Sequence, residues 1–104
     1  MIRAFLVRGH SMAPRVPDGA LVLVRSLPGP PAPGAVVVYR HRTRGFPVVH
    51  RVQAAGPGGW RLQGDANLAP DPLAVDREAM LGRVWLVLPR LGRLLTFFRQ
   101  EKLP

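Results

Sequence analysis

Short apolar runs rich in β-branched residues alternate with segments rich in proline and glycine along the whole chain. The runs ALVLVR at 20–25 and AVVVYR at 35–40 each follow a glycine and have the composition of buried strands. Five segments are predicted as strands: residues 20–25, 35–40, 46–54, 60–63 and 82–88. Glycines at 56–59 predict a tight turn and therefore a hairpin between the third and fourth of them. This pattern predicts an all-β fold.

Two segments between the strands are predicted as loops. Residues 27–34 (LPGPPAPG) contain four prolines, which cannot donate the hydrogen bonds of a sheet. Residues 65–76 are rich in proline and aspartate and show no apolar periodicity. A loop of that length in a small domain is usually functional.

The length of 104 residues has room for one hydrophobic core, so residues 1–104 are expected to form a single domain. The sequence contains no cysteine, which excludes disulfides and thiolate metal sites. No histidine pair has the spacing of metal ligands, and the glycines at 56–59 lack the lysine and helix of a phosphate-binding loop. No cofactor and no catalytic metal are therefore expected.

The formal net charge of +9 comes almost entirely from arginine, because Lys102 is the only lysine. Such a surface attracts polyanions through its long-range field, although a genome rich in G and C also produces an arginine-rich composition. A non-enzymatic basic β-domain that binds nucleic acid or an anionic membrane is therefore one alternative. Aromatic residues are sparse and scattered, which disfavours nucleic acid.

No segment is predicted to span a membrane. Residues 2–7 are too short for the core of a signal peptide, and the apolar stretch 81–98 contains three arginines. Leucine and phenylalanine recur at helical spacing in 91–98, which predicts a short C-terminal helix. This helix is expected to pack on its own domain, with peripheral contact to a membrane surface as the alternative.

With metals excluded, hydroxyl nucleophile chemistry remains. It needs a serine or threonine and a base within hydrogen-bond reach. The aliphatic hydroxyls are Ser11, Ser26, Thr43 and Thr96. Ser11 follows Gly9, where substrate backbone can approach closely, and precedes a buried strand.

Four motifs resemble the signal peptidase family, in that family's order. Residues 9–14 (GHSMAP), followed by Gly19 and a strand, are similar to its nucleophile box. Residues 33–39 (PGAVVVY), 49–52 (VHRV) and 64–71 (GDANLAPD) are similar to its next three boxes. The resemblance covers about residues 9–92 and implies a coiled antiparallel sheet, shared with the related repressor peptidases.

The resemblance implies Ser11 as the nucleophile and His50 as its general base. One branch of the family and the self-cleaving repressors use lysine as the base, whereas another branch uses histidine. Lys102 lies beyond the last motif. His10 is adjacent to Ser11 and is expected to point away from it, and His41 lies in the cationic turn RHRTR.

The same resemblance implies that Asp71 orients the histidine, with Asp65 as the second candidate or a structural partner. Asn67 is expected to brace their loop. Gly9, Ser11 and Met12 are expected at the oxyanion and substrate-binding site, with the Ser11 N–H as the main donor. Gly9 stands where the lysine branch has a serine that helps to bind the oxyanion.

These inferences predict a serine endopeptidase that cleaves a signal peptide or an N-terminal propeptide through an acyl-enzyme on Ser11. Its partner would be a protein or peptide and not a nucleic acid. A third alternative is a family member that folds without cutting. A Ser11 hydroxyl more than about 5 Å from both ring nitrogens of His50 would favour that alternative.

Overall fold

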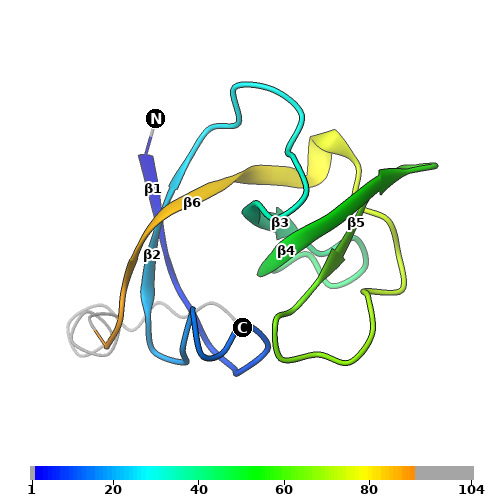
Figure 1. The fold of residues 1–104 in the computed structure, drawn as a ribbon. Helices are drawn as coiled ribbons and strands as arrows, with labels where there is room; N and C mark the ends of the chain where they lie inside the picture. Colours follow the sequence, from blue (N-terminus) through cyan, green and yellow to red (C-terminus); the bar gives the residue numbers. More distant parts are fainter. Residues whose placement is uncertain (1, 91–104) are drawn as a thin grey trace.

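The apolar runs become strands of one open, coiled sheet in the computed structural model, which describes residues 2–90 (Figure 1). The strands are β1 (Ile2–Leu6), β2 (Leu21–Arg25), β3 (Val36–Arg40), β4 (Pro47–Gly56), β5 (Gly59–Gln63) and β6 (Met80–Leu88). Their order in the sheet is β1-β2-β6-β3-β4-β5, and every neighbouring pair is antiparallel. One 3-10 turn, η1 (Arg77–Ala79), precedes β6.

The all-β prediction is confirmed, and each of the five predicted strands is present with ends that differ by at most two residues. The hairpin at 56–59 is also confirmed, because Gly56 pairs with Gly59. Strand β1 was not predicted. It is an edge strand whose first three residues are exposed, so its sequence lacks the alternation of a half-buried strand. The predicted C-terminal helix lies outside the described residues.

The two faces of the sheet carry two separate apolar clusters, as alternating residues of β3 illustrate. Val38 points into the first cluster, whereas Val37 and Tyr39 point into the second. The first consists of Phe5, Val7, Met12, Val16, Ala20, Val22, Val24 and Val38. The second consists of Ala35, Val37, Tyr39, Val52, Leu62 and Val75. Tyr39 is therefore fixed by core packing.

Two connections bring distant segments to the same region. The loop between β1 and β2 is closed at its base by hydrogen bonds between Val7 and Ala20 and between Gly19 and Val7. The segment after β5 returns along that strand, where Trp60 and Val75 pair through both backbone groups. Both loops thus have fixed ends.

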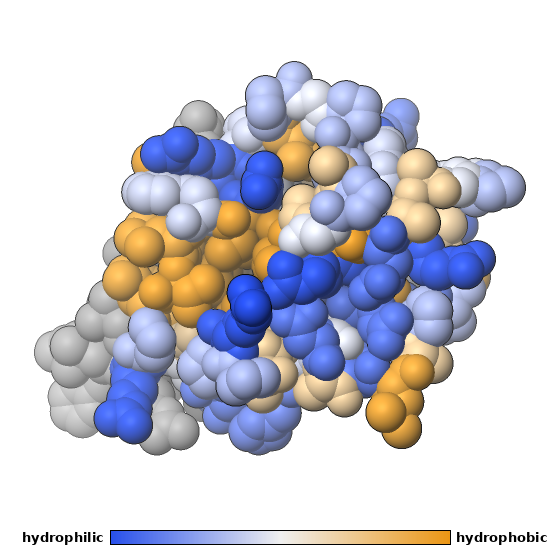
Figure 2. Space-filling model, in the orientation of Figure 1, coloured by the Kyte–Doolittle hydropathy of each residue, from blue (hydrophilic) through white to orange (hydrophobic). Residues whose placement is uncertain are grey.

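Apolar surface is unevenly distributed. Figure 2 shows an apolar area over β2 and β6 beside a mostly hydrophilic region over β4 and β5. Half-buried residues of β6, Val84 and Val87, pack on the first cluster, and Trp85 beside them is 42% exposed. Within residues 2–90, no helix has the length and apolar character needed to cross a bilayer.

Candidate active site

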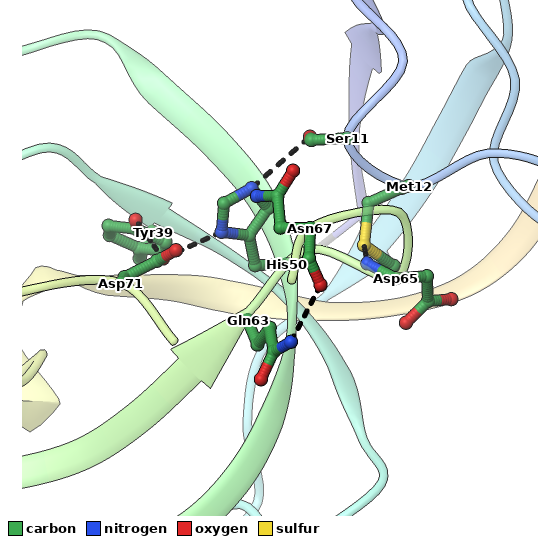
Figure 3. Close-up of polar contacts among 8 residues, drawn as sticks. All are labelled: Ser11, Met12, Tyr39, His50, Gln63, Asp65, Asn67 and Asp71. Atoms are coloured by element: carbon green, nitrogen blue, oxygen red, sulfur yellow. Dashed lines mark hydrogen bonds and ion pairs between the residues drawn. The ribbon is translucent and has the colours of Figure 1, made fainter. Parts of the chain in front are cut away.

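Ser11, His50 and Asp71 form a continuous chain of hydrogen bonds (Figure 3). The Ser11 Oγ lies 3.2 Å from the His50 Nε2. The His50 Nδ1 lies 2.6 Å from the Asp71 Oδ2. Three residues separated by 39 and 21 positions in the sequence therefore meet at one place.

The chemistry of the partners determines the direction of these bonds. An ionised carboxylate only accepts hydrogen bonds, so the Nδ1 of His50 must carry the proton that it shares with Asp71. In the neutral ring, the Nε2 is then an acceptor and the Ser11 hydroxyl donates to it. This arrangement leaves the imidazole able to take the serine proton.

His50 is held by strand β4 and is 7% exposed. It is directly opposite Val37 of β3, so its position is determined by the sheet register. A buried imidazole with both nitrogens hydrogen-bonded has few alternative orientations. The His50 imidazole is therefore held in one orientation.

Ser11 lies in the loop between β1 and β2, which the loop after β5 contacts directly. The Ala66 N–H donates to the Ser11 carbonyl at 2.8 Å. At Gly64, a Cβ would lie 2.6 Å from that same carbonyl oxygen and 3.0 Å from the Ser11 Cβ. Only glycine permits such a close approach of the two backbones.

The Asp65 carboxylate binds Arg51 and not His50. Two hydrogen bonds of 2.8 and 2.9 Å join it to the Arg51 guanidinium, which also donates to the Gly34 carbonyl at 2.7 Å. The bonds from Arg51 hold the pKa of Asp65 below its usual value, and those bonds raise the pKa of Arg51. Of the two candidate acids, only Asp71 contacts the imidazole.

The loop that carries Asp71 is held by backbone groups. The Asp71 N–H donates to the Leu62 carbonyl at 2.7 Å. Asn67, which was expected to brace this loop, donates its N–H to the Gly64 carbonyl and accepts from the Gln63 side chain at its own carbonyl. The bracing by Asn67 is thus through its backbone.

Tyr39 is a member of this constellation that the sequence analysis missed. Its hydroxyl donates to the Asp71 Oδ2 at 2.8 Å. Burial, together with the hydrogen bond to Asp71, raises the pKa of Tyr39, so this hydroxyl stays protonated. No sequence pattern pointed to this role, because the closeness of Tyr39 to His50 follows from the pairing of β3 with β4.

Two residues expected at the oxyanion site have other contacts. The Gly9 N–H donates to the Asp18 carboxylate at 2.8 Å, which excludes it as an oxyanion donor in this conformation. The Met12 side chain is 1% exposed in the first cluster, and its Sδ accepts from the Asp65 N–H. Among residues 2–90, no acceptor is bonded to the Ser11 N–H.

A family model described as peptidase S24-like matches residues 2–85. The chain belongs to the peptidase S24-like family. Membership confirms the broad peptidase resemblance drawn from the four motifs, and the matched range contains Ser11, His50 and Asp71. No curated protein matches the chain.

The S24-like domain has a cavity of about 200 Å³ beside its serine. One wall is the end of β1 with the residues that follow it, and the other is the start of β4. Its lining consists of Phe5, Leu6, Val7, Arg8, Ser11, Met12, Val38, Phe46, Pro47, Val48 and Val49. An apolar side chain of moderate size fits such a cavity.

The other histidines of the S24-like domain lie outside the constellation. The Nδ1 of His41 accepts from the N–H groups of Thr43 and Arg44, so this ring closes its own turn. His10 is exposed. Among residues 2–90, His50 is the one histidine hydrogen-bonded to Ser11.

Proposed function

We propose that this chain is a serine endopeptidase of the signal peptidase type, in which Ser11 is the nucleophile, His50 the general base and Asp71 the orienting acid. The observation that carries the proposal is the hydrogen-bond chain from the Ser11 Oγ through both nitrogens of His50 to Asp71. Nucleophile, base and orienting group in this order are an arrangement that catalyses acyl transfer on several unrelated folds.

The reaction proceeds in two steps with His50 moving the proton. The Ser11 Oγ attacks the peptide carbonyl carbon while the Nε2 takes the hydroxyl proton. The Nε2 then returns that proton to the leaving amine, the C–N bond breaks, and an ester on Ser11 remains. Water then attacks the ester carbonyl carbon while the same nitrogen takes a water proton; the C–Oγ bond breaks, this proton passes to the Ser11 Oγ, and the carboxylic acid product leaves. Asp71 stabilises the imidazolium formed in each step.

The Ser11 N–H is the proposed donor to the oxyanion. It belongs to the nucleophile itself, and no acceptor among the described residues uses it. A backbone donor aimed at the developing negative charge contributes several kcal/mol of transition-state stabilisation, on the order of 3. Gly9 is left out of this role because Asp18 holds its N–H.

The substrate is proposed to bind as an extended peptide between β1 and the start of β4. Strand β1 is at the edge of the sheet, and β5 pairs with β4 only from Arg51 onward. Residues 47–50 of β4 therefore have a strand on one side alone. Unpaired backbone groups of this kind accept an added strand.

The apolar cavity beside Ser11 has room for a small or medium apolar side chain of the substrate next to the cleaved bond. A signal peptide or a short N-terminal propeptide meets this requirement. The histidine branch is the proposed place within the wider family, because His50 stands in the VHRV motif and bonds to the serine.

Labelling with a fluorophosphonate, which phosphonylates activated serines with loss of fluoride, tests the proposal. The wild-type chain should be labelled at Ser11, and Ser11→Ala or His50→Gln should abolish labelling. Ser26→Ala is a matched control, because Ser26 is exposed directly after β2, and this variant should label normally. Labelling that survives both Ser11→Ala and His50→Gln would overturn the proposal.

The two other readings have less support. A family member that does not cut would be favoured by a separation of more than about 5 Å between the Ser11 hydroxyl and the His50 ring nitrogens. The Ser11 Oγ lies only 3.2 Å from the His50 Nε2. A basic domain that only binds polyanions does not account for the part-buried chain of hydrogen bonds through Ser11, His50 and Asp71, because a buried ion pair by itself adds little stability.

A further inference from the structure

A single carboxylate oxygen at the site receives two hydrogen bonds. The Asp71 Oδ2 accepts from the His50 Nδ1 at 2.6 Å and from the Tyr39 hydroxyl at 2.8 Å (Figure 3). Among residues 2–90, these two are the only side chains bonded to that carboxylate. Tyr39 is therefore its one contact to the sheet apart from the base itself.

Asp71 needs a second contact because of where it lies. It belongs to a loop without strand structure, and its backbone is held at the N–H by Leu62. That bond leaves rotation about the two side-chain torsions free. With His50 as the only partner, the carboxylate could turn either oxygen, or neither, toward the Nδ1. The Tyr39 hydroxyl removes this freedom.

Tyr39 is itself a rigid support. It is 6% exposed and packs in the second apolar cluster. Strands β3 and β4 pair so that Val37 is opposite His50, and Tyr39, two residues further, points to the same face. The Tyr39 and His50 rings meet edge to face, with centroids 6.2 Å apart. Two neighbouring strands thus direct two donors to one oxygen.

We propose that Tyr39 is a positioning residue of the site, whose hydroxyl holds the Asp71 Oδ2 against the His50 Nδ1 during the reaction. This inference rests on the proposed function, because it assigns Tyr39 a role in the chemistry of Ser11. Tyr39 touches neither the serine nor the substrate cavity, so it acts only through Asp71.

The substitution Tyr39→Phe removes the hydroxyl and keeps the ring. For fluorophosphonate labelling of Ser11, we expect the maximal rate to fall about 10- to 100-fold, the range for losing a hydrogen bond to a charged group. The half-saturating reagent concentration should stay within about twofold. Ser26→Ala, which also removes one hydroxyl, should change neither quantity.

A double-mutant cycle with Asp71→Asn separates positioning from general damage. If Tyr39 acts through Asp71, adding Tyr39→Phe to Asp71→Asn should slow labelling by less than about twofold further. An equal loss in both backgrounds would overturn the proposal, as would an unchanged rate in Tyr39→Phe alone. Rates are compared well below the melting temperature of each variant, so loss of fold does not contribute.

One readout does not depend on catalysis. The proton on the His50 Nδ1, held in a 2.6 Å bond, should give a protected downfield proton resonance in NMR spectra of the wild-type chain. Tyr39→Phe should make this proton exchange faster with water. If Ser11 proves unreactive in the wild type, the proposed function fails, and this exchange rate still tests Tyr39. An unchanged rate would refute its positioning role.

Discussion

Removing the charge of either aspartate in the loop after β5 should affect a different property of the protein. Asp65→Asn breaks the ion pair with Arg51, whose two bonds are 2.8 and 2.9 Å long. Asp71→Asn replaces the acceptor of the His50 Nδ1–H. We expect the first to destabilise the fold and the second to slow the chemistry.

The magnitude for Asp65 follows from its burial. The side chains of Arg51 and Asp65 are 25% and 19% exposed, between a surface pair, which contributes about 0–1 kcal/mol, and a buried pair, whose disruption costs about 3–5 kcal/mol. Allowing for solvent screening, we expect Asp65→Asn to lower the free energy of unfolding by about 1–2 kcal/mol. In a domain of this size, the melting temperature falls by about 5–15 °C.

The pH dependence of this loss has a defined sign. The pKa of Asp65 is lowered from 3.8, chiefly by the hydrogen bonds from Arg51. A depressed folded-state pKa stabilises the fold above the unfolded value, and this contribution disappears as the pH falls through the folded-state pKa. Wild type and Asp65→Asn should therefore differ in melting temperature at pH 7 and converge at pH values well below 3.8.

Thermal unfolding and fluorophosphonate labelling, measured on the same samples, test the assignment. Asp65→Asn should melt earlier and, well below its melting temperature, label within about threefold of the wild type. Asp71→Asn should label about 10³- to 10⁴-fold more slowly, as expected when the imidazole loses its orienting acceptor. If Asp65→Asn slows labelling as strongly as Asp71→Asn at unchanged stability, Asp65 is the orienting acid and the reasoning is wrong.

Two further substitutions test how the loops and the cavity serve the site. Gly64→Ala places a Cβ 2.6 Å from the Ser11 carbonyl oxygen, so it should displace the serine and slow fluorophosphonate labelling at least about tenfold. At Gly29 an added Cβ would meet nothing within 4 Å, so Gly29→Ala should label normally. Equal labelling rates in the two variants would show that the close contact of Gly64 with Ser11 does not position the serine. Leu6→Trp fills the cavity beside Ser11 and should raise the KM for a peptide with an apolar side chain next to the cleaved bond. A KM unchanged in Leu6→Trp, with labelling by a small fluorophosphonate preserved, would place the substrate elsewhere.

The strands of the interior could be predicted from the sequence because burial leaves a local signature. The runs at 20–25 and 35–40 are almost continuously apolar and each follows a glycine, and both contain strands. β1 lacked this signature because its first three residues are exposed, and its strand character comes from pairing with β2. Edge strands depend on their neighbours more than on their own pattern.

The candidate site could likewise be predicted from the sequence only in part. The four motifs nominated Ser11, His50 and Asp71, and the composition left Lys102 as the sole lysine. The motifs ranked Asp71 ahead of Asp65 but left Asp65 as the second candidate, because two acids of one loop differ only in what they face. The fold directs Asp65 toward Arg51 and Asp71 toward His50.

The sequence by itself determined the inventory: an all-β chain with few hydroxyls, no cysteine and a serine in a recognisable motif. Only the tertiary structure decided which groups meet. Tyr39 contacts Asp71 from 32 positions away, and the Gly9 N–H is taken by Asp18. These contacts arise from strand register and loop closure between residues far apart in the chain, and a local pattern of residues does not encode them.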